Sequence, residues 1–300
     1  GPVFGRYLYL GKGVDIPLQA RSRDGAALAL SEEGPCGEAN CGNGQTPPVA
    51  AVWTLEVGEK GRLAGVWKGE RELRLELSRQ GSRFEPAAPA TPLDLFRHSE
   101  DLSWNGDPIT LASEPYDHLR LDVPQAMSDP LGWSDARFSF ATDPRIGYAA
   151  PRIAEIAGGS PDAANALLEQ RHRRDSLSAF ACAALQYAGF SEDGSRRPAG
   201  SGSFGGWDTD AWAEVVALTP KLMSWNESGS RFCGGAHPYN YSNSYTMDVA
   251  AGALLSLGDM FEDAQDDRPG ETLVAFVRDT RERPAPGGVD ARHEEECGTD

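Results

Sequence analysis

The sequence contains no run of about 18 consecutive apolar residues, the length that a membrane-spanning helix requires. Its longest apolar stretches are interrupted within a few positions by Asp, Arg or Gly. Basic residues are also few: 28 Lys and Arg stand against 45 Asp and Glu, which gives a formal net charge of −17. Nucleic acid and anionic membrane surfaces are therefore poor partners, because both are bound through basic patches. We expect no transmembrane segment in this chain.

The negative charge is unevenly distributed, since residues 101–300 carry −16 of it. A field of this sign would attract and steer a cationic protein partner. The alternative is that the charge only keeps the protein in solution.

The sequence also lacks the common catalytic motifs. It has no phosphate-binding loop ending in Lys-Ser or Lys-Thr, no His-Glu-x-x-His and no Gly-x-Ser-x-Gly. The five histidines are scattered, and His172 lies in a basic run where we expect it to face solvent. Two carboxylates suited to glycoside hydrolysis cannot be picked out among 45 acidic residues. We therefore expect neither an enzyme nor a bound cofactor or metal. Calcium at the acidic cluster from Asp259 to Asp267 stays open, although its spacing is not that of an EF-hand.

Cysteine is scarce, but two of the five cysteines lie close together. Cys36 and Cys41 flank a turn-rich stretch with too many Gly residues for a helix or strand interior. A local Cys36–Cys41 disulfide is favoured over zinc, because no second Cys pair or Cys/His knuckle completes a four-ligand site. Such a bond indicates an oxidising compartment, such as a bacterial periplasm or the cell exterior.

Residues 1–85 are predicted to form an antiparallel β module, with Gly1 and Pro2 as the remnant of a cleaved tag. Apolar and polar residues alternate at 14–19 and 72–77, and similar short runs are separated by Gly-containing turns. The alternation is typical of an antiparallel meander with one face exposed to water.

The stretch 86–110 is predicted to be a Pro/Ala-rich linker. After it, 111–300 are predicted to form an α+β domain with helices packed on an antiparallel sheet. Within it we expect one strand-like run at 119–123, a helix from Ser160 to Gly189 with a kink at 175–176, and then four strands between 212 and 257. A last helix should begin near 270. The polar end of the sequence leads us to expect that the domain is incomplete at its C-terminus.

One segment resembles a known family. A Gly-Gly-Ala-His-Pro run occupies 234–238, and a Leu-Gly-Asp-Met-Phe segment follows at 257–261. Together they resemble the RsiV-like C-terminal domain, found in a lysozyme-sensing anti-sigma factor and beside some peptidoglycan deacetylases. The resemblance covers about 115–265. The preceding meander resembles small β modules of Gram-negative envelope proteins, on the pattern of 5–9 and 13–18.

The resemblance implies a binding protein that recognises a lysozyme-like peptidoglycan hydrolase and inhibits it, as an inhibitor or immunity protein, by occluding its cleft with a loop. It also implies a periplasmic protein or an outer-membrane-anchored lipoprotein. The alternative is a glycan-binding or peptidoglycan-binding module that assists cell-wall remodelling. The candidate partner-binding residues are Trp225, Gly234, Gly235, His237, Pro238, Tyr239 and Asn240. A geometric role of the loop and burial of the flanking aromatic residues are the competing interpretations.

A second disulfide is predicted to anchor this loop. Cys233 lies beside the Gly-Gly turn, and we expect it to pair with Cys182 on the preceding helix. The second choice is Cys233 with Cys297; in the first case Cys297 would find its partner beyond the present C-terminus.

Overall fold

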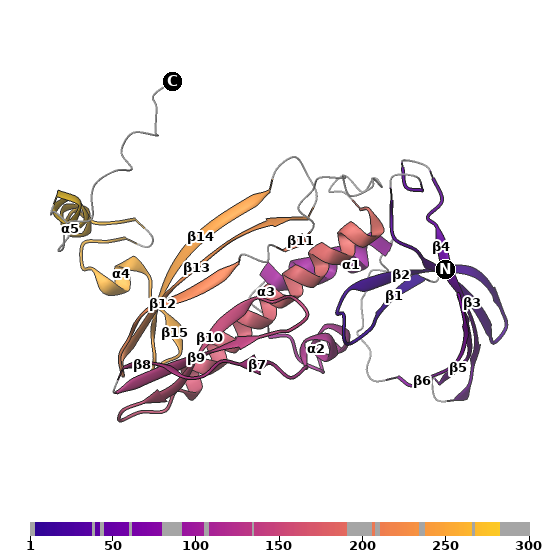
Figure 1. Ribbon diagram of the computed structural model, residues 1–300, viewed down its shortest axis with the longest axis horizontal. Helices are drawn as coiled ribbons and strands as arrows, with labels where there is room; N and C mark the ends of the chain where they lie inside the picture. Colours follow the sequence, from indigo (N-terminus) through magenta and orange to yellow (C-terminus); the bar gives the residue numbers. More distant parts are fainter. Residues whose placement is uncertain are drawn as a thin grey trace, which may run out of the picture.

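The computed structural model describes residues 4–37, 40–42, 45–59, 62–79, 92–104, 108–133, 135–190, 206–207, 211–233, 238–265 and 268–282. It combines antiparallel sheets with helices in a mixed α+β architecture. Figure 1 shows the N-terminal sheet at one end and the long helix α3 running away from it beneath the later strands.

The N-terminal module is an antiparallel meander in which each strand pairs with the next along the chain. Its strands are β1 (Phe4–Leu8), β2 (Asp15–Asp24), β3 (Ala27–Glu33), β4 (Val49–Val57), β5 (Leu63–Lys68) and β6 (Glu72–Leu77). Period-two alternation places Leu30, Trp53 and Leu55 on one buried face. The buried carboxylate of Glu32 accepts hydrogen bonds from the indole Nε1 of Trp53 at 3.0 Å and of Trp67 at 2.6 Å.

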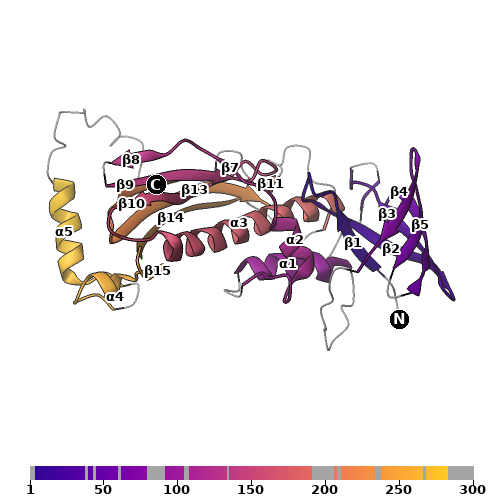
Figure 2. The same cartoon turned by 90° about the horizontal axis from the view of Figure 1, so that it is seen from below.

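The rest of the chain forms two further sheets, and both pack against one long helix. The helices are α1 (Pro92–Trp104), α2 (Pro115–Leu121), α3 (Asp162–Ala188), α4 (Leu257–Met260) and α5 (Glu271–Glu282). One sheet contains β7 (Ala126–Met127), β8 (Leu131–Trp133), β9 (Ala136–Thr142) and β10 (Ala149–Ile156); the other contains β11 (Gly206–Trp207), β12 (Trp212–Leu218), β13 (Leu222–Phe232), β14 (Tyr239–Asp248) and β15 (Ala253–Leu254). Figure 2 shows the strands of both sheets on one side of α3 and α1 on the other.

Helix α3 buries apolar side chains on two faces. Near its start, Ala164 and Leu168 join a core built with both neighbouring sheets. Further along, Leu177 and Phe180 pack with residues of α1 and α2. The two faces are roughly 170° apart at 100° per residue. The helix ends at Gly189, which adopts the left-handed conformation with φ of 70°.

Three expectations about these helices are wrong. The predicted linker contains α1, because Leu93, Phe96 and Leu102 are buried and hold that segment as a helix. The strand-like run at 119–123 belongs largely to helix α2. Helix α3 continues without interruption through 175–176, because each of its two apolar faces has its own packing partners. The last helix begins at Glu271, close to the predicted position.

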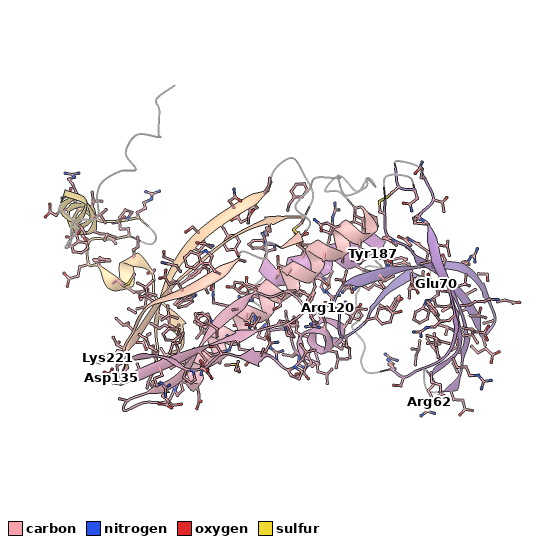
Figure 3. All side chains as sticks on the ribbon, viewed as in Figure 1. Arg62, Glu70, Arg120, Asp135, Tyr187 and Lys221 are labelled. Carbon is pink, nitrogen blue, oxygen red and sulfur yellow. A yellow bond between two sulfur atoms is a disulfide. The ribbon has the colours of Figure 1, made fainter. Side chains whose placement is uncertain are left out.

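A buried ionic network joins the N-terminal module to α2. Arg6 of β1 contacts Asp15 at 3.0 Å and Asp117 at 3.2 Å. Arg120 of α2, whose side chain is fully buried, forms ion pairs with the same two carboxylates. Two arginines thus share two aspartates across the boundary between module and helix (Arg120 is labelled in Figure 3).

Neutral groups complete this network. The hydroxyl of Tyr116 donates to Asp15 at 2.6 Å, and the hydroxyl of Ser99 donates to Asp117 at 3.0 Å. At the far end of α3, the hydroxyl of Tyr187 donates to the backbone carbonyl of Glu33 at 3.0 Å. These contacts fix the module against the helical layer.

Replacing Asp15 with Asn is expected to lower the free energy of unfolding by about 3–5 kcal/mol, because Arg6 and Arg120 would keep their buried charges with one carboxylate fewer. Urea denaturation at pH 7 measures the change. Arg173→Gln is the matched control, since it breaks the partly exposed pair with Glu169 and should cost less than about 1 kcal/mol. Equal effects of the two substitutions would contradict a structural role for the network.

Candidate functional site

The hairpin of β13 and β14 carries the loop that the sequence singles out. Ten residue pairs join the two strands, from Leu222 opposite Asp248 to Arg231 opposite Tyr239. The loop residues Gly234, Gly235 and His237 lie outside the described residues. What can be described are the two strand ends that hold this loop.

The β13 end of the loop is fastened to α3. Cys182 of the helix is bonded to Cys233, the pairing chosen from the sequence, and their Cα atoms lie 4.7 Å apart. The side-chain amide of Gln186 donates to the backbone carbonyl of Phe232 at 2.6 Å. The loop therefore starts from a fixed point. The local disulfide Cys36–Cys41 is also present, with 5.2 Å between the Cα atoms.

Alternate positions of the hairpin face α3, and their chemistry changes along the strands. Met223 and Trp225 are fully buried in the apolar core. The same alternation continues on β13 to Glu227, Gly229 and Arg231. On β14, Tyr245 lies opposite Trp225, and the next three inward positions are Asn243, Tyr241 and Tyr239. The inward face thus becomes polar and aromatic towards the loop.

Helix α3 shows the same change along one stripe. Residues spaced three or four apart lie on one side of a helix. The stripe that faces the hairpin consists of Ala164, Leu168, Arg171, Asp175, Ser178, Cys182 and Gln186. It is apolar where the strands are apolar, and polar where they are polar.

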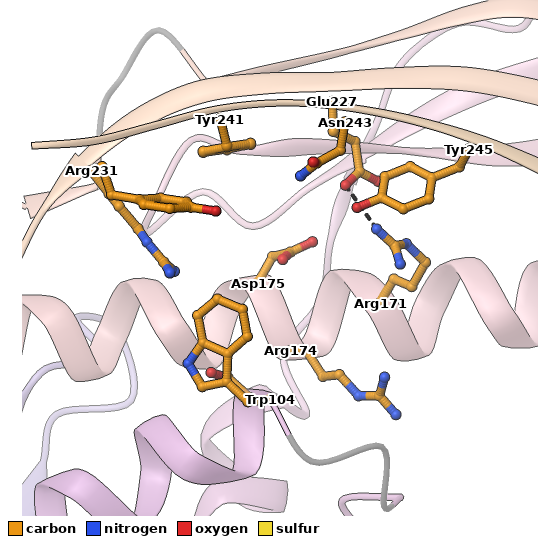
Figure 4. A pocket seen from close by; sticks show the side chains of 11 residues that line it. Trp104, Arg171, Arg174, Asp175, Glu227, Arg231, Tyr241, Asn243 and Tyr245 are labelled. Carbon is orange, nitrogen blue, oxygen red and sulfur yellow. Dashed lines mark hydrogen bonds and ion pairs between the residues drawn. The ribbon is translucent and has the colours of Figure 1, made fainter. Parts of the chain in front are cut away.

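A cavity of about 200 Å³ lies between these polar halves. Figure 4 shows Arg171 and Asp175 rising from α3 towards the strands, with Trp104 of α1 close to them. Its lining residues are Ser103, Trp104, Arg171, Arg174, Asp175, Glu227, Arg231, Tyr239, Tyr241, Asn243 and Tyr245.

Glu227 is held by two partners at the inner end of the cavity. Arg171 forms an ion pair with it at 2.9 Å, and the indole Nε1 of Trp225 donates to its other oxygen at 2.7 Å. The guanidinium of Arg171 also lies 3.9 Å from the ring centroid of Tyr245. These contacts fix the carboxylate and the arginine in a neutral pair.

Arg231 lies at the outer end between two aromatic rings. Its guanidinium carbon is 4.8 Å from the ring of Trp104 and 5.0 Å from the ring of Tyr239. It also donates to the hydroxyl of Ser178 at 2.8 Å. Beside it, Tyr239 and Tyr241 stack with 6.2 Å between ring centroids.

Gly229 explains how Tyr241 enters the cavity. The two residues are opposite each other in the register of the hairpin. A Cβ atom on Gly229 would approach the hydroxyl oxygen of Tyr241 to 2.7 Å, so any larger residue would displace the ring.

The acidity of Asp175 in the cavity is strongly perturbed. Desolvation raises its pKa from 3.8 to about 7, and the negative charge of Glu227 adds to the shift, while Arg171, Arg231 and Arg174 oppose it. Burial also raises the pKa of Tyr241 and Tyr245 above their ordinary value.

The predicted partner-binding residues fall into three groups. Trp225 is fully buried, so its role as an exposed anchor is wrong; its large ring fills the core where the inward face is still apolar. Pro238, Tyr239 and Asn240 are exposed at the start of β14, and 54% of Tyr239 is accessible. The remaining candidates are the loop residues outside the described part of the chain.

Sequence reasoning considered the aromatic residues that flank the loop but missed the charged residues of the cavity, above all Arg171, Asp175 and Arg231. A signal was present in the alternation of β13, where Glu227 and Arg231 occupy positions that should face the core. A charged residue at such a position indicates a buried pair or a lined cavity.

The expectation that His172 faces solvent is also wrong. Its side chain is buried between α3 and β10, where Arg152 donates to its Nδ1 at 3.2 Å. Desolvation and the charge of Arg152 lower its pKa to about 4. A neutral imidazole can accept that hydrogen bond, whereas a protonated one cannot.

Among the described residues no group of three or more His, Cys, Asp or Glu side chains could hold a metal ion. In the acidic cluster after β15, Asp259 forms a capping box with Ser256, and Asp263 accepts a hydrogen bond from the backbone of Thr272. These two carboxylates have structural roles in this part of the chain.

Comparison of the chain with protein-family models, curated proteins and solved structures found no match. The likeness to the RsiV-like domain therefore stays a prediction carried by the motif residues.

Removal of the two disulfides is expected to have unequal effects. The Cys182→Ala/Cys233→Ala variant opens a loop with a sequence separation of 51 and should lose about 4 kcal/mol of stability, whereas Cys36→Ala/Cys41→Ala opens a separation of 5 and should lose about 2 kcal/mol. Urea denaturation of both variants tests the difference. A larger loss from the short loop would show that chain entropy does not govern these bonds.

The Asp175→Asn variant is expected to gain stability relative to the parent as pH rises. Because the folded-state pKa of Asp175 is raised, the folded parent binds an extra proton between pH 3.8 and about 7 and loses stability as that proton leaves. The Asn variant has no such proton. Urea denaturation at pH 4.5, 6 and 8 measures the free energy of unfolding of the variant and of the parent. The difference between the two should grow up to about pH 7 and then level off, and a constant difference would contradict the raised pKa.

Proposed function

We propose that this protein is a cell-envelope binding protein that recognises and inhibits a lysozyme-like peptidoglycan hydrolase. The β13–β14 loop would enter the substrate cleft of the hydrolase and block it. On this proposal the protein acts by binding and not by catalysis.

The observation that carries this proposal is the anchored end of the hairpin. The disulfide at Cys233 and the hydrogen bond from Gln186 hold one side of the loop on α3. On the other side, Tyr239 and Asn240 are exposed. An anchored strand end next to an accessible aromatic side chain loses little conformational entropy on binding, which favours tight association.

Charge supports a cationic partner. Residues 101–300 carry −16 of the formal charge, so a basic hydrolase would be drawn towards this part of the chain. Charges at the rim of an interface act mainly on the association rate.

We propose a periplasmic or outer-membrane-anchored location in a Gram-negative bacterium. Two disulfides fit an oxidising compartment. No helix in the described part of the chain has the length and apolar composition to cross a membrane.

A second candidate function is a glycan-binding module that assists cell-wall remodelling. The observation in its favour is the cavity, where four aromatic side chains lie near arginine and amide groups: Trp104, Tyr239, Tyr241 and Tyr245. Aromatic faces with a few polar groups are typical of small-molecule sites.

Tyr239→Ala is expected to raise the dissociation rate from a susceptible lysozyme-type enzyme at least tenfold, because central aromatic anchors govern residence time. Biolayer interferometry against a panel of cationic lysozymes measures it. Tyr9→Ala is the matched control: Tyr9 is also 54% exposed but belongs to the N-terminal module, so its loss should leave the rate unchanged.

The salt dependence provides the second arm of this experiment. Raising the salt from 50 to 300 mM should slow association of the parent and of Tyr239→Ala to the same degree, because the mutation leaves the acidic field intact. If no member of the panel is bound or inhibited, the hydrolase proposal is wrong. If Tyr239→Ala binds as well as the parent, the contact surface lies elsewhere.

A further inference from the structure

We propose that a second cavity, to which the β13–β14 hairpin contributes no residue, binds a free amino acid with an apolar side chain. This His172 cavity has a volume of about 270 Å³. It lies between the segment that joins α2 to β7, the strands β9 and β10, and the middle of α3. Its polar lining includes Asp122, Gln125, Arg152 and His172. The proposal does not rest on hydrolase inhibition, because it uses neither the loop nor the cavity beside it.

His172 provides a buried hydrogen-bond donor. Its side chain is 3% exposed, and Arg152 donates to its Nδ1 at 3.2 Å, so the proton of the neutral imidazole is on Nε2. Within the described part of the chain this Nε2 has no hydrogen-bond partner. The backbone carbonyl of Tyr148 lies near the ring but does not reach hydrogen-bonding geometry with Nε2. A ligand acceptor would remove the cost of this unpaired donor.

Gln125 provides a buried acceptor in the same cavity. Its side-chain nitrogen donates to the backbone carbonyl of Val123 at 3.3 Å, whereas its buried Oε1 accepts from none of the described groups. A ligand that satisfies both Gln125 and His172 must therefore carry a donor as well as an acceptor.

Two of the carboxylates that line the cavity already have cationic partners. Glu169 forms an ion pair with Arg173 at 2.9 Å. Asp143 accepts a hydrogen bond from Nε of Arg145 at 2.9 Å. Each pair is close to neutral, so neither of them selects the charge of a ligand.

One cationic and one anionic side chain of the lining have no such partner among the described residues. The guanidinium of Arg152 donates to the carbonyl of Pro151 and to His172, both neutral groups. Desolvation lowers its pKa to about 10, and the charge of Glu169 opposes this fall without forming an ion pair. Asp122 is exposed at the end of α2 and forms no ion pair in this part of the chain.

These two charges favour a zwitterion. A ligand carboxylate would bind the guanidinium of Arg152 and accept from Nε2 of His172. A ligand ammonium would donate to Oε1 of Gln125 and be attracted by Asp122. An amino acid carries both groups on one carbon atom, whereas a simple anion or cation would satisfy only one side of the cavity.

The remaining lining favours an apolar side chain on that amino acid. It includes four apolar residues, Leu121, Val123, Met127 and Ala141. The volume is below the roughly 300 Å³ at which sites for drug-sized ligands begin. The cavity therefore suits a single small molecule and not a segment of a partner protein.

Titration at pH 7, followed by protein NMR spectra that also measure weak binding, tests the proposal with four probes. Leucine carries all three recognised groups, leucinamide lacks the carboxylate, N-acetylleucine lacks the ammonium, and glycine lacks the apolar side chain. We expect leucine to bind at least about tenfold more tightly than each of the others.

Two variants assign the charges of the ligand to residues. Arg152→Gln should weaken binding of leucine at least about tenfold and leave leucinamide unchanged, because leucinamide has no carboxylate to lose. The Gln side chain can still donate to Nδ1 of His172. Asp122→Asn should weaken leucine by about threefold and leave N-acetylleucine unchanged, because an exposed charge contributes less. A general loss of structure would not produce this selectivity.

The matched controls carry the same changes outside the cavity. Arg137→Gln removes an exposed arginine of β9, and Asp129→Asn removes an exposed aspartate after β7. Both should bind leucine as the parent does. Circular dichroism checks that each variant is folded.

The proposal is overturned if leucine does not bind, or if any of the other three probes binds as tightly. It is also overturned if a folded Arg152→Gln variant loses affinity for leucine and leucinamide to the same degree. Hydrolase inhibition by the same preparations is scored separately, so failure of the amino acid site leaves that proposal standing and the reverse also holds.

Discussion

A single unbroken helix organises the C-terminal part of this protein. Helix α3 contains 27 residues, about 40 Å of helix, and no single layer covers it along its whole length. Its first turns are buried with Met223 and Trp225 of the hairpin, and its later turns pack on α1 and α2. The stripe that still faces the hairpin in its second half is polar. Hydrophobic burial therefore cannot hold the second half of α3 against the hairpin. The ion pair of Arg171, the hydrogen bond of Ser178 and the disulfide of Cys182 join helix and sheet there instead.

The ionic network between the N-terminal module and α2 has a different physical role. Burying Arg120 and Asp15 costs desolvation energy that their attraction only partly offsets. Such a network adds less to stability than an apolar contact of equal size would. A shift of the module relative to α2 would, however, break buried ion pairs and leave their charges uncompensated. The charges of β1 and β2 match those of α2 in one arrangement. The network therefore specifies how the module sits on the helices, which apolar contacts alone would leave less sharply defined.

Patterns over a few neighbouring residues predicted those helices and strands whose formation depends on neighbouring residues. Alternation identified the strands of the N-terminal module, and Gly189 identified the end of α3. Helix α1 was missed because the neighbouring prolines outweighed the spacing of its buried residues. Run 119–123 alternates in hydrophobicity, yet Arg120 is buried by ion pairs that no local pattern reveals. The cavity was missed for the same reason, since it depends on the register between residues far apart in the chain.

That register connects the loop and the cavity. Because side chains alternate along a strand, a slip of one residue between β13 and β14 would turn Arg231 or Tyr241 away from α3. The buried pair of Met223 and Met247 fixes the register at one end of the hairpin. At the other end, Cys233 continues the inward alternation and is bonded to α3. The disulfide thus does more than anchor the loop. It also keeps the inward-facing polar side chains of the hairpin directed at α3, in a region that has no apolar core to do this.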